Sequence, residues 1–156
     1  MKVYRITKAK YANLDGIGGL YVAGRWNMKG HRAIYSAESI SLAAWEKLVH
    51  VTDYRDLPVD LVVVTIDVPD SIKIEEIPDN VLAPGWNEPL PYRSYKKETV
   101  MYGTEFLEQN KYLILKIPSA VISGEHNYLI NPNHSDIHKC KIEKVVAFKF
   151  DERIKK

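Results

Sequence analysis

Three residues with side chains suited to catalysis or ligand binding lie close together in the first third of the sequence. Arg25, Tyr35 and Glu46 fall within the stretch GRWNMKGHRAIYSAESISLAAWE. A guanidinium binds a phosphate through two parallel hydrogen bonds, and a tyrosine can contact a sugar or a planar base. A carboxylate that faces a cleft can stabilise a cationic transition state or bind ribose hydroxyls. All three are therefore candidate site residues.

Ordinary structural roles explain the same residues when each is taken alone. Arg25 can be a surface arginine beside a packed Trp26, and Tyr35 can be a core tyrosine whose hydroxyl has found a partner. Glu46 can be a solvated carboxylate or one half of an ion pair with Lys47 or His50. The local sequence leaves both interpretations open for each residue.

A fourth candidate, Ser119, follows Pro118 at the expected end of a strand. Taken alone, it is typical of a capping or turn serine. The sequence contains no G-x-S-x-G elbow, so a nucleophilic serine with a Ser-His-Asp triad is not indicated.

The histidine-rich tail offers a weaker hypothesis. His134, His138 and Cys140 have a spacing that could hold zinc if the segment folded suitably, but no C-x-x-C pair exists elsewhere to complete the site. Asn131 and Pro132 begin the run NPNH, which is typical of a turn. We therefore expect turn chemistry here and no metal.

The composition is that of an ordinary globular protein. The chain has 156 residues, of which 46% are hydrophobic and 27% are charged, and its net charge is +2. That length predicts a single domain over residues 1–156, and the near-neutral charge disfavours nucleic-acid binding. The single cysteine excludes an intrachain disulfide and fits a reducing cytoplasm. No apolar run is long enough for a membrane helix, and the N-terminus lacks a signal segment.

The hydrophobic pattern predicts more strands than helices, without regular alternation between them. LVVVTIDV is the strongest strand signal, and its unbroken apolar run indicates burial on both faces. Further strands are expected at about residues 2–7, 32–37, 71–77, 111–118 and 141–150, with a short one within 119–134. This mixed order favours a compact α+β domain with a mixed sheet.

Two helices are expected between these strands. The first spans about residues 39–51, with Ser39 or Ser41 as its N-cap. At about 100° per residue, its apolar arc is formed by Leu42, Trp45, Leu48 and Val49. Glu46 falls at the border of that arc. The second helix covers 94–109, after a proline-rich surface loop over 78–92.

A glycine-dense loop, NLDGIGG, does not fit the dinucleotide fingerprint G-x-G-x-x-G. After Gly16 and Gly18, the third glycine position is Tyr21. The sequence also lacks a Walker-type lysine motif. A nucleotide, if the protein binds one, is therefore held by neither a Rossmann nor a P-loop turn.

Two long blocks of the sequence resemble one known family. GRWNMKGHRAIYSAESISLAAWE and the later LKIPSAVISGEHNYLINPNHSD are similar to the RES domain, the toxin half of RES–Xre toxin–antitoxin pairs. The family is named for an arginine, a glutamate and a serine, which match Arg25, Glu46 and Ser119. Tyr35 matches the tyrosine that follows the family's R-W-N turn. The resemblance covers most of the chain, with residues 52–100 carrying no family motif.

A further short stretch, GTEFL at Gly103, resembles the family's pattern of a glycine, an acid and an aromatic residue. Thr104 stands there where an aspartate is more usual. This position lies outside the arginine, glutamate and serine of the family name.

The resemblance implies a fold like that of the ADP-ribosyltransferases and an activity on NAD⁺. Toxic members break the nicotinamide–ribose bond by phosphorolysis or hydrolysis. On this basis Glu46 would stabilise the oxocarbenium-like state, and Arg25 would grip the pyrophosphate. Tyr35 would pack on a ring or bind the ribose. Ser119 would bind the nicotinamide amide or the ribose.

The resemblance also implies the partners of the protein. No cofactor is expected beyond NAD⁺ as substrate, with inorganic phosphate as a candidate co-substrate held by Arg25, Arg32 or Lys47. An Xre-type antitoxin is the expected protein partner in a hetero-oligomer. It would cover the cleft or occupy it.

Two other functions stay open at this point. ADP-ribosyl transfer onto a protein would use the same NAD⁺ site and differ only in its acceptor. A non-catalytic module that only pairs with a partner would have no physical need for all four matched residues. Any contact with DNA is expected from the antitoxin rather than from this chain.

Overall fold

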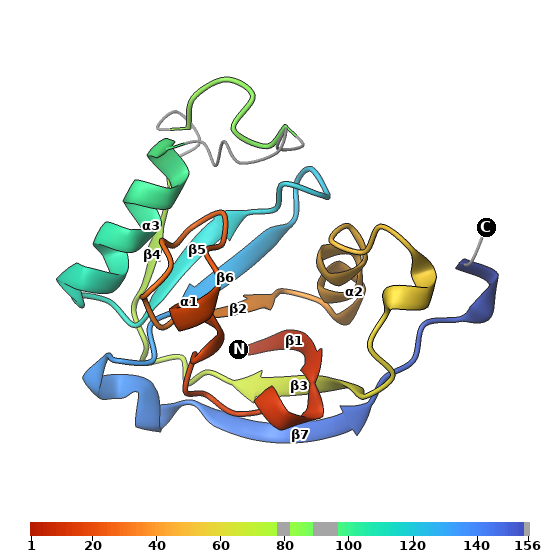
Figure 1. Ribbon diagram of the computed structural model, residues 1–156. Coiled ribbons are helices and arrows are strands. Elements are labelled where there is room, and N and C mark those ends of the chain that lie inside the picture. Colours follow the sequence, from red (N-terminus) through yellow and green to blue (C-terminus); the bar gives the residue numbers. More distant parts are fainter. Residues whose placement is uncertain (78–81, 89–96, 155–156) are drawn as a thin grey trace.

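The computed structural model describes residues 1–77, 82–88 and 97–154, and in this part the chain forms one seven-stranded mixed sheet (Figure 1). The strands are β1 (Lys2–Lys8), β2 (Ile34–Ala37), β3 (Leu61–Asp67), β4 (Ile74–Glu76), β5 (Ile114–Pro118), β6 (His126–Ile130) and β7 (Lys141–Ala147). Their order across the sheet is β4-β5-β6-β2-β1-β3-β7. Strands that are consecutive in the sequence are therefore often not adjacent in the sheet.

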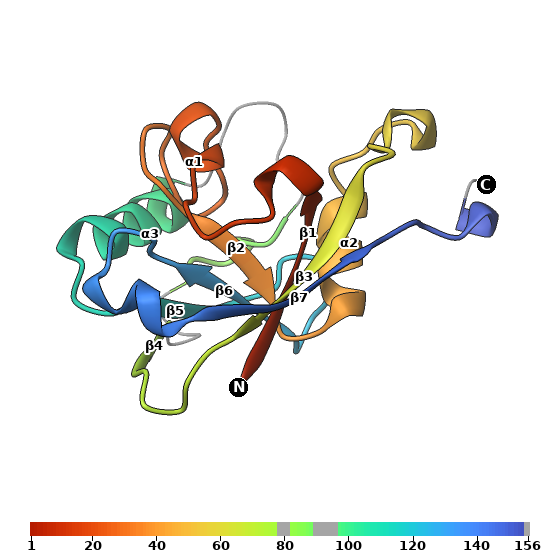
Figure 2. The same cartoon turned by 90° about the horizontal axis from the view of Figure 1, so that it is seen from below.

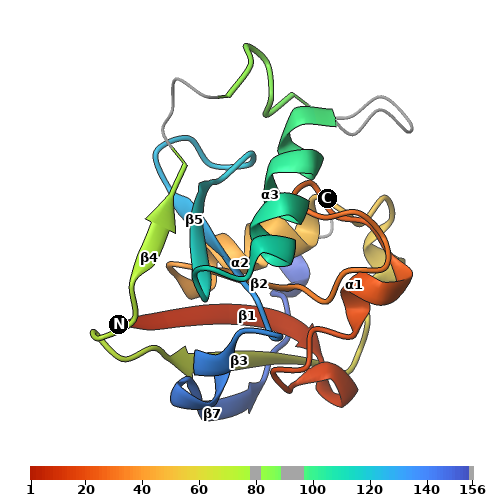
Figure 3. The same ribbon diagram turned by 90° about the vertical axis from the view of Figure 1, so that its left-hand side faces the viewer.

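Strand pairing is antiparallel everywhere except between β4 and β5. That parallel pair needs a crossover, and the helix α3 (Lys97–Gln109) lies within it. The sheet is strongly twisted, so that β1 and β3 cross steeply below β4 and β5 in Figure 3. This twist brings the ends of distant strands around one central region.

Two longer helices cover the same side of the sheet, which we call the helix face. α2 (Ile40–Leu48) contacts β1 and β2, whereas α3 packs over β5 and β6, and β2 lies between the two helices in Figure 2. A one-turn helix, α1 (Gly18–Tyr21), and short 3₁₀ turns at Ala9–Tyr11, Tyr54–Asp56, Ser135–Lys139 and Glu152–Ile154 complete the described elements.

Successive side chains along each strand point to opposite faces of the sheet, so each face has its own buried residues. The face opposite the helices carries one apolar cluster, with Val3, Ile34, Val64, Ile66, Ile114 and Ile130 buried together. On the helix face, α3 and α2 each cover a separate apolar cluster. The residues of β2, β5 and β6 on that face are Tyr35, Ala37, Leu115, Ile117, Asn127 and Leu129. The amide of Asn127 is therefore placed between two apolar clusters.

The first helix begins where its capping signal predicts. The Ser39 side chain accepts a hydrogen bond from the Leu42 backbone N–H at 3.0 Å, which makes Ser39 the N-cap. The helix ends at Leu48, a few residues before the predicted end at 51. Helix ends fray and are the least predictable part of an element.

The predicted buried arc of α2 is only half right: Leu42 is buried and Leu48 packs against the same cluster, but Trp45 and Val49 do not. Trp45 and Val49 are each 51% exposed, whereas Leu42 and Ala43 are buried. On a helical wheel Glu46 falls between Leu42 and Ala43, at about 40° from Leu42. Small side chains at the contact let α2 approach the sheet closely, and the large indole stays outside. Glu46 thus points inward instead of lying at the border of the buried arc.

The predicted strands are confirmed, most of them shorter than expected. β3 is buried on both faces, as its apolar run indicates. The strand expected over 71–77 is reduced to Ile74–Glu76 at the sheet edge. Residues 94–96 of the second predicted helix, and 78–81 and 89–92 of the proline-rich loop, lie outside the described residues.

Within the described ranges, we find no helix long and apolar enough to cross a membrane. The mixed sheet with few helices confirms the predicted α+β class. The prediction of one domain over the whole length stays a prediction.

Candidate active site

A carboxylate held by two donors forms the centre of the candidate site. The Ser119 hydroxyl donates to Glu46 Oε1 at 2.8 Å, and the Asn127 side-chain amide donates to the same oxygen in a short hydrogen bond. Glu46 comes from α2, Ser119 from the end of β5, and Asn127 from β6. Three elements far apart in sequence therefore fix one half-buried carboxylate.

Both bonds end on the same oxygen of Glu46, and this matters for its chemistry. Among the described residues, Oε2 accepts no hydrogen bond. Hydrogen bonds to a charged group contribute about 1.5–3 kcal/mol each, and a half-buried carboxylate is costly without them. The carboxylate is thus anchored through one oxygen, while the other is available to a ligand.

Ser119 is a turn serine, as its sequence indicates, and its contact with a substrate stays a prediction. Its hydroxyl oxygen accepts from the backbone N–H groups of Val121 and Ile122, both at 3.0 Å, as a turn serine does. The same hydroxyl donates to Glu46. The β5–β6 hairpin is closed beside it by the Ser119 N–H, which bonds the Glu125 carbonyl at 2.8 Å. The turn therefore directs the hydroxyl proton at the carboxylate.

Asn127 is a site residue that the sequence reasoning missed. It pairs with Ala37 on one side and Ile117 on the other, so it occupies the middle of the helix face. The signal was available: in HNYLI an amide stands two residues before Leu129, on the inward side of a strand. A polar residue at an inward position of a central strand needs a partner, and that partner is Glu46.

Tyr35 holds the turn that carries Arg25. Its hydroxyl accepts from the Trp26 backbone N–H at 3.1 Å and donates to Asn27 Oδ1 at 2.7 Å. We call residues 24–28 the Arg25 turn, which is closed by the Gly24 N–H on the Asn27 carbonyl at 3.0 Å. Gly24 is required because a Cβ there would lie 2.5 Å from the Tyr35 hydroxyl. The tyrosine thus positions the turn, and its contact with a substrate stays a prediction.

Arg25 reaches from that turn to the proline-rich loop. Its Nη1 donates to the Trp86 carbonyl at 2.7 Å, and the ring centroids of Trp26 and Trp86 lie 5.9 Å apart. Trp26 is only 2% exposed, so its ring packs in the core and offers no open face to a base. The described part of the loop, 82–88, therefore supports Arg25. The sequence of the loop did not indicate this role.

The sheet register relates the two parts of the site. Tyr35 on β2 lies opposite Leu129, and the diagonal neighbour of Tyr35 on β6 is Asn127. Diagonal neighbours on one face lie roughly 7–8 Å apart. The Arg25 turn, which rests on Tyr35, and the Glu46 carboxylate, which rests on Asn127, therefore occupy adjoining positions on the helix face.

The other predicted phosphate ligands lie elsewhere. Arg32 donates to the Asp15 carbonyl at 2.8 Å and lines a cavity of about 360 Å³ with His31 and Glu108, a cavity that does not include Glu46. Burial lowers the pKa of Lys47, and the nearby positive charges of Lys8 and Arg5 lower it further. Among the described residues, neither side chain makes a hydrogen bond or ion pair with Glu46.

The histidine-rich tail forms the turn that its sequence predicts. The Asn133 N–H bonds Asn131 Oδ1 at 3.0 Å, and the His134 ring nitrogen Nδ1 accepts from the Asp136 N–H at 3.1 Å. His138 Nδ1 lies 2.6 Å from the Ser135 carbonyl. Among the described residues no group of three His, Cys, Asp or Glu side chains is placed to hold a metal ion.

Proteins similar to this chain match it over most or all of its length. "Toxin Res" of Photorhabdus laumondii is 35% identical over 159 residues, covering 100% of this chain and 98% of its own. "Toxin Res" of Pseudomonas putida is 36% identical and covers 99% of both chains. The "Prs ADP-ribosylating toxin" of a Sphingobium species is 32% identical over 91% of this chain and 86% of its own.

A solved structure has the same fold. A chain in the crystal structure of the M. tuberculosis MbcT–MbcA toxin–antitoxin complex matches with a TM-score of 0.65, over 95% of this chain and 84% of that one. The two are 18% identical, so this likeness shows the fold alone. The RES domain, as a family, matches residues 2–151. Together with the full-length relatives, this match shows that the chain belongs to the RES domain family.

Proposed function

We propose that this chain is the toxin of a toxin–antitoxin system and acts by cleaving the nicotinamide–ribose bond of NAD⁺. The observation that carries the proposal is the Glu46 carboxylate, anchored through one oxygen by Ser119 and Asn127. The relatives named as toxins support the biological role. The relative named as an ADP-ribosylating toxin supports a chemistry on the nicotinamide–ribose bond.

The geometry suits an N-glycosidic cleavage. Positive charge develops on the ribose ring as the bond to nicotinamide breaks, and a carboxylate nearby stabilises it. Nicotinamide leaves as a neutral molecule, so no strong general acid is required. Glu46 Oε2 would face the ribose, and Arg25 on the adjoining turn would bind the pyrophosphate. Water or inorganic phosphate would then capture the ribosyl cation.

The decisive experiment measures NAD⁺ loss with purified protein, with and without inorganic phosphate, and identifies the products by mass. Loss that depends on phosphate and yields ADP-ribose phosphate would make the enzyme a phosphorylase. Loss without phosphate, yielding ADP-ribose, would make it a glycohydrolase. The absence of NAD⁺ loss in both buffers would refute free NAD⁺ degradation.

A second candidate function is ADP-ribosyl transfer onto a protein, favoured by the name of the Sphingobium relative. It would use the same donor site, so the two functions differ in the fate of the ADP-ribose. NAD⁺ labelled in its adenylate half, incubated with the protein and a bacterial lysate, separates them. Label that stays on a protein band after denaturation supports transfer, whereas label only in small products supports degradation.

The partner proposal is an Xre-type antitoxin that covers or occupies the site. The fold likeness to a chain of a toxin–antitoxin complex is consistent with such a partner. Co-expression with a candidate Xre-type protein tests it: a stable complex that suppresses NAD⁺ loss supports the pairing. A complex that leaves the activity unchanged would place the partner away from the site.

A further inference from the structure

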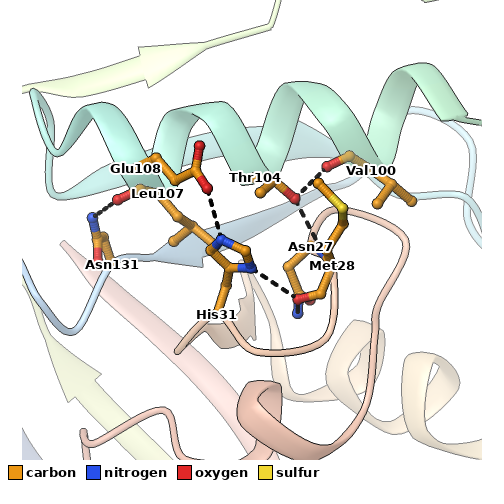
Figure 4. A network of polar contacts seen from close by, with 8 residues as sticks. All are labelled: Asn27, Met28, His31, Val100, Thr104, Leu107, Glu108 and Asn131. Carbon is orange, nitrogen blue, oxygen red and sulfur yellow. Dashed lines mark hydrogen bonds and ion pairs between the residues drawn. The ribbon is translucent and has the colours of Figure 1, made fainter.

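The helix α3 contacts the Arg25 turn and the residues that follow it, and these contacts lie outside the carboxylate cluster. Figure 4 shows them along one side of α3: Thr104 bonds the backbone of Met28, and Glu108 bonds the ring of His31. Gly103, the residue before Thr104 on α3, lies directly against the backbone of Trp26 in the Arg25 turn. None of the three α3 residues belongs to the arginine, glutamate and serine that name the family.

Gly103 allows the closest of these contacts. A Cβ at this position would lie 2.0 Å from the Trp26 carbonyl oxygen and 2.8 Å from its carbonyl carbon. Glycine inside a helix costs about 0.5–1 kcal/mol relative to alanine, so local helix stability does not explain it. The close approach of the turn backbone to α3 explains why glycine stands at this position.

Thr104 uses both functions of its hydroxyl. Oγ1 accepts from the Met28 backbone N–H at 2.9 Å and donates to the Val100 carbonyl at 2.6 Å. The residue is 2% exposed, so the Met28 N–H is bonded by a group shielded from water. Valine has the same shape without this acceptor, and serine keeps the acceptor without the methyl group. The position therefore offers a matched pair of variants.

The third contact is the weakest. His31 Nε2 lies 2.9 Å from Glu108 Oε1, and His31 Nδ1 lies 3.3 Å from the Met28 carbonyl. Glu108 is 61% exposed, and exposed ion pairs contribute little. Glu108→Gln is therefore a control on the same face of α3.

We propose that Gly103 and Thr104 are positioning residues: they hold the Arg25 turn against α3 and so, together with the Trp86 carbonyl that bonds the guanidinium, set where Arg25 points. Tyr35 holds the turn from β2, and α3 holds it from the other side through backbone groups. Arg25 lies one residue before Trp26, whose carbonyl rests on Gly103. The kinetic consequence rests on the proposed function, because Arg25 is there the group that binds the NAD⁺ pyrophosphate.

The first experiment needs no substrate. Amide exchange of Met28 is measured by NMR in the wild type, Thr104→Val, Thr104→Ser and Glu108→Gln, with the Leu42 amide at the α2 cap as an internal reference. We expect the Met28 amide to exchange about tenfold faster or more in Thr104→Val. An amide exchanges when its local segment opens, and the hydrogen bond to Thr104 is one of the bonds that oppose this opening. In Thr104→Ser and Glu108→Gln, the exchange rate of the Met28 amide should stay near the wild-type value. Equal protection of Met28 in all four proteins would overturn the proposal.

The second experiment measures KM and kcat for NAD⁺ in the same variants and in Gly103→Ala. A group that binds the substrate and the transition state equally affects KM and leaves kcat unchanged. We therefore expect misplacement of Arg25 to raise KM about tenfold in Thr104→Val and Gly103→Ala. Thr104→Ser should restore the wild-type KM. In an Arg25→Ala background, Thr104→Val should have no further effect on KM, because the group it positions is gone.

The outcomes separate this proposal from the proposed function. Additive effects of Thr104→Val and Arg25→Ala on KM, in an active enzyme, would overturn the positioning role and leave the function intact. A wild type that does not turn over NAD⁺ would overturn the function. Met28 exchange would then decide whether Thr104 holds the Arg25 turn: faster exchange in Thr104→Val alone supports this part of the proposal, and unchanged exchange rejects it.

Discussion

The α2 side and the α3 side of the helix face hold their charged residues in different ways. On the α2 side, Glu46 is fixed directly, by side-chain donors from Ser119 and Asn127. On the α3 side, Arg25 sits on a turn whose backbone is held by Tyr35, Gly103 and Thr104, and its guanidinium bonds a backbone carbonyl, that of Trp86. A group that acts on a developing charge must be held at its own atoms. The arginine is instead positioned by the turn that carries it and by the Trp86 carbonyl.

The largest expected effect comes from the α2 side. Glu46→Gln keeps an Oε1 that can accept from Ser119 and Asn127 but removes the negative charge. We expect kcat for NAD⁺ to fall about 100-fold or more, since loss of one preorganised electrostatic group costs that much in other active sites. The melting temperature should stay near the wild-type value. A Gln variant with wild-type kcat would remove Glu46 from the chemistry.

Arg25→Ala tests the other side of the comparison. We expect KM for NAD⁺ to rise about tenfold to hundredfold, because a hydrogen bond to a charged group contributes about 1.5–3 kcal/mol. The effect on kcat should be smaller, which would distinguish a binding group from one that acts in the transition state. Arg25→Lys serves as the matched control and should be intermediate, because lysine keeps the charge without the fork. An unchanged KM in both variants would contradict pyrophosphate binding.

Asn127→Ala sharpens the comparison, because it removes a donor and leaves the carboxylate. With one of its two anchors gone, Glu46 should be less well oriented, and we expect kcat to fall about tenfold. Ser119→Ala removes the second donor to the same oxygen and should have an effect of similar size. If only the serine variant lost activity, Asn127 would have a structural role alone.

The smallest effect is expected from Tyr35→Phe. The Trp26 N–H and Asn27 would lose their shared partner, which should lower the free energy of unfolding by about 1 kcal/mol and raise KM a few-fold. Denaturant unfolding and NAD⁺ kinetics measure the two effects. Tyr4→Phe is the control, because Tyr4 lies on the same face and its hydroxyl makes no hydrogen bond within the described residues. Equal behaviour of the two variants would argue against the positioning role of Tyr35.

Much of the fold follows from local pattern. The strongest strand, the Ser39 cap and the NPNH turn are where the sequence predicts them, since each depends on contacts within a few residues. The orientation of α2 was not predictable in the same way. Its wheel offers Trp45 and Val49 as apolar candidates, and only the fit against the sheet shows that both stay exposed.

The site shows the same limit. The family motifs led to Arg25, Tyr35, Glu46 and Ser119, but no supporting role was predicted for the residues that hold them. Asn127, Trp86 and Thr104 lie far away in sequence and bond the candidate residues or their turn across element boundaries. The periodicity of a strand can mark an inward polar residue such as Asn127, but a single sequence does not name the distant partner that it bonds.

The sequence by itself determined the class of fold, the capped first helix and the set of side chains available for chemistry. These follow from hydrophobic period, turn residues and motif identity, all of which are local. The tertiary structure alone decided that Glu46 points inward, that both its bonds end on one oxygen, and that the Arg25 turn rests between β2 and α3. Such relations depend on strand order and helix rotation, which are set when the whole chain packs.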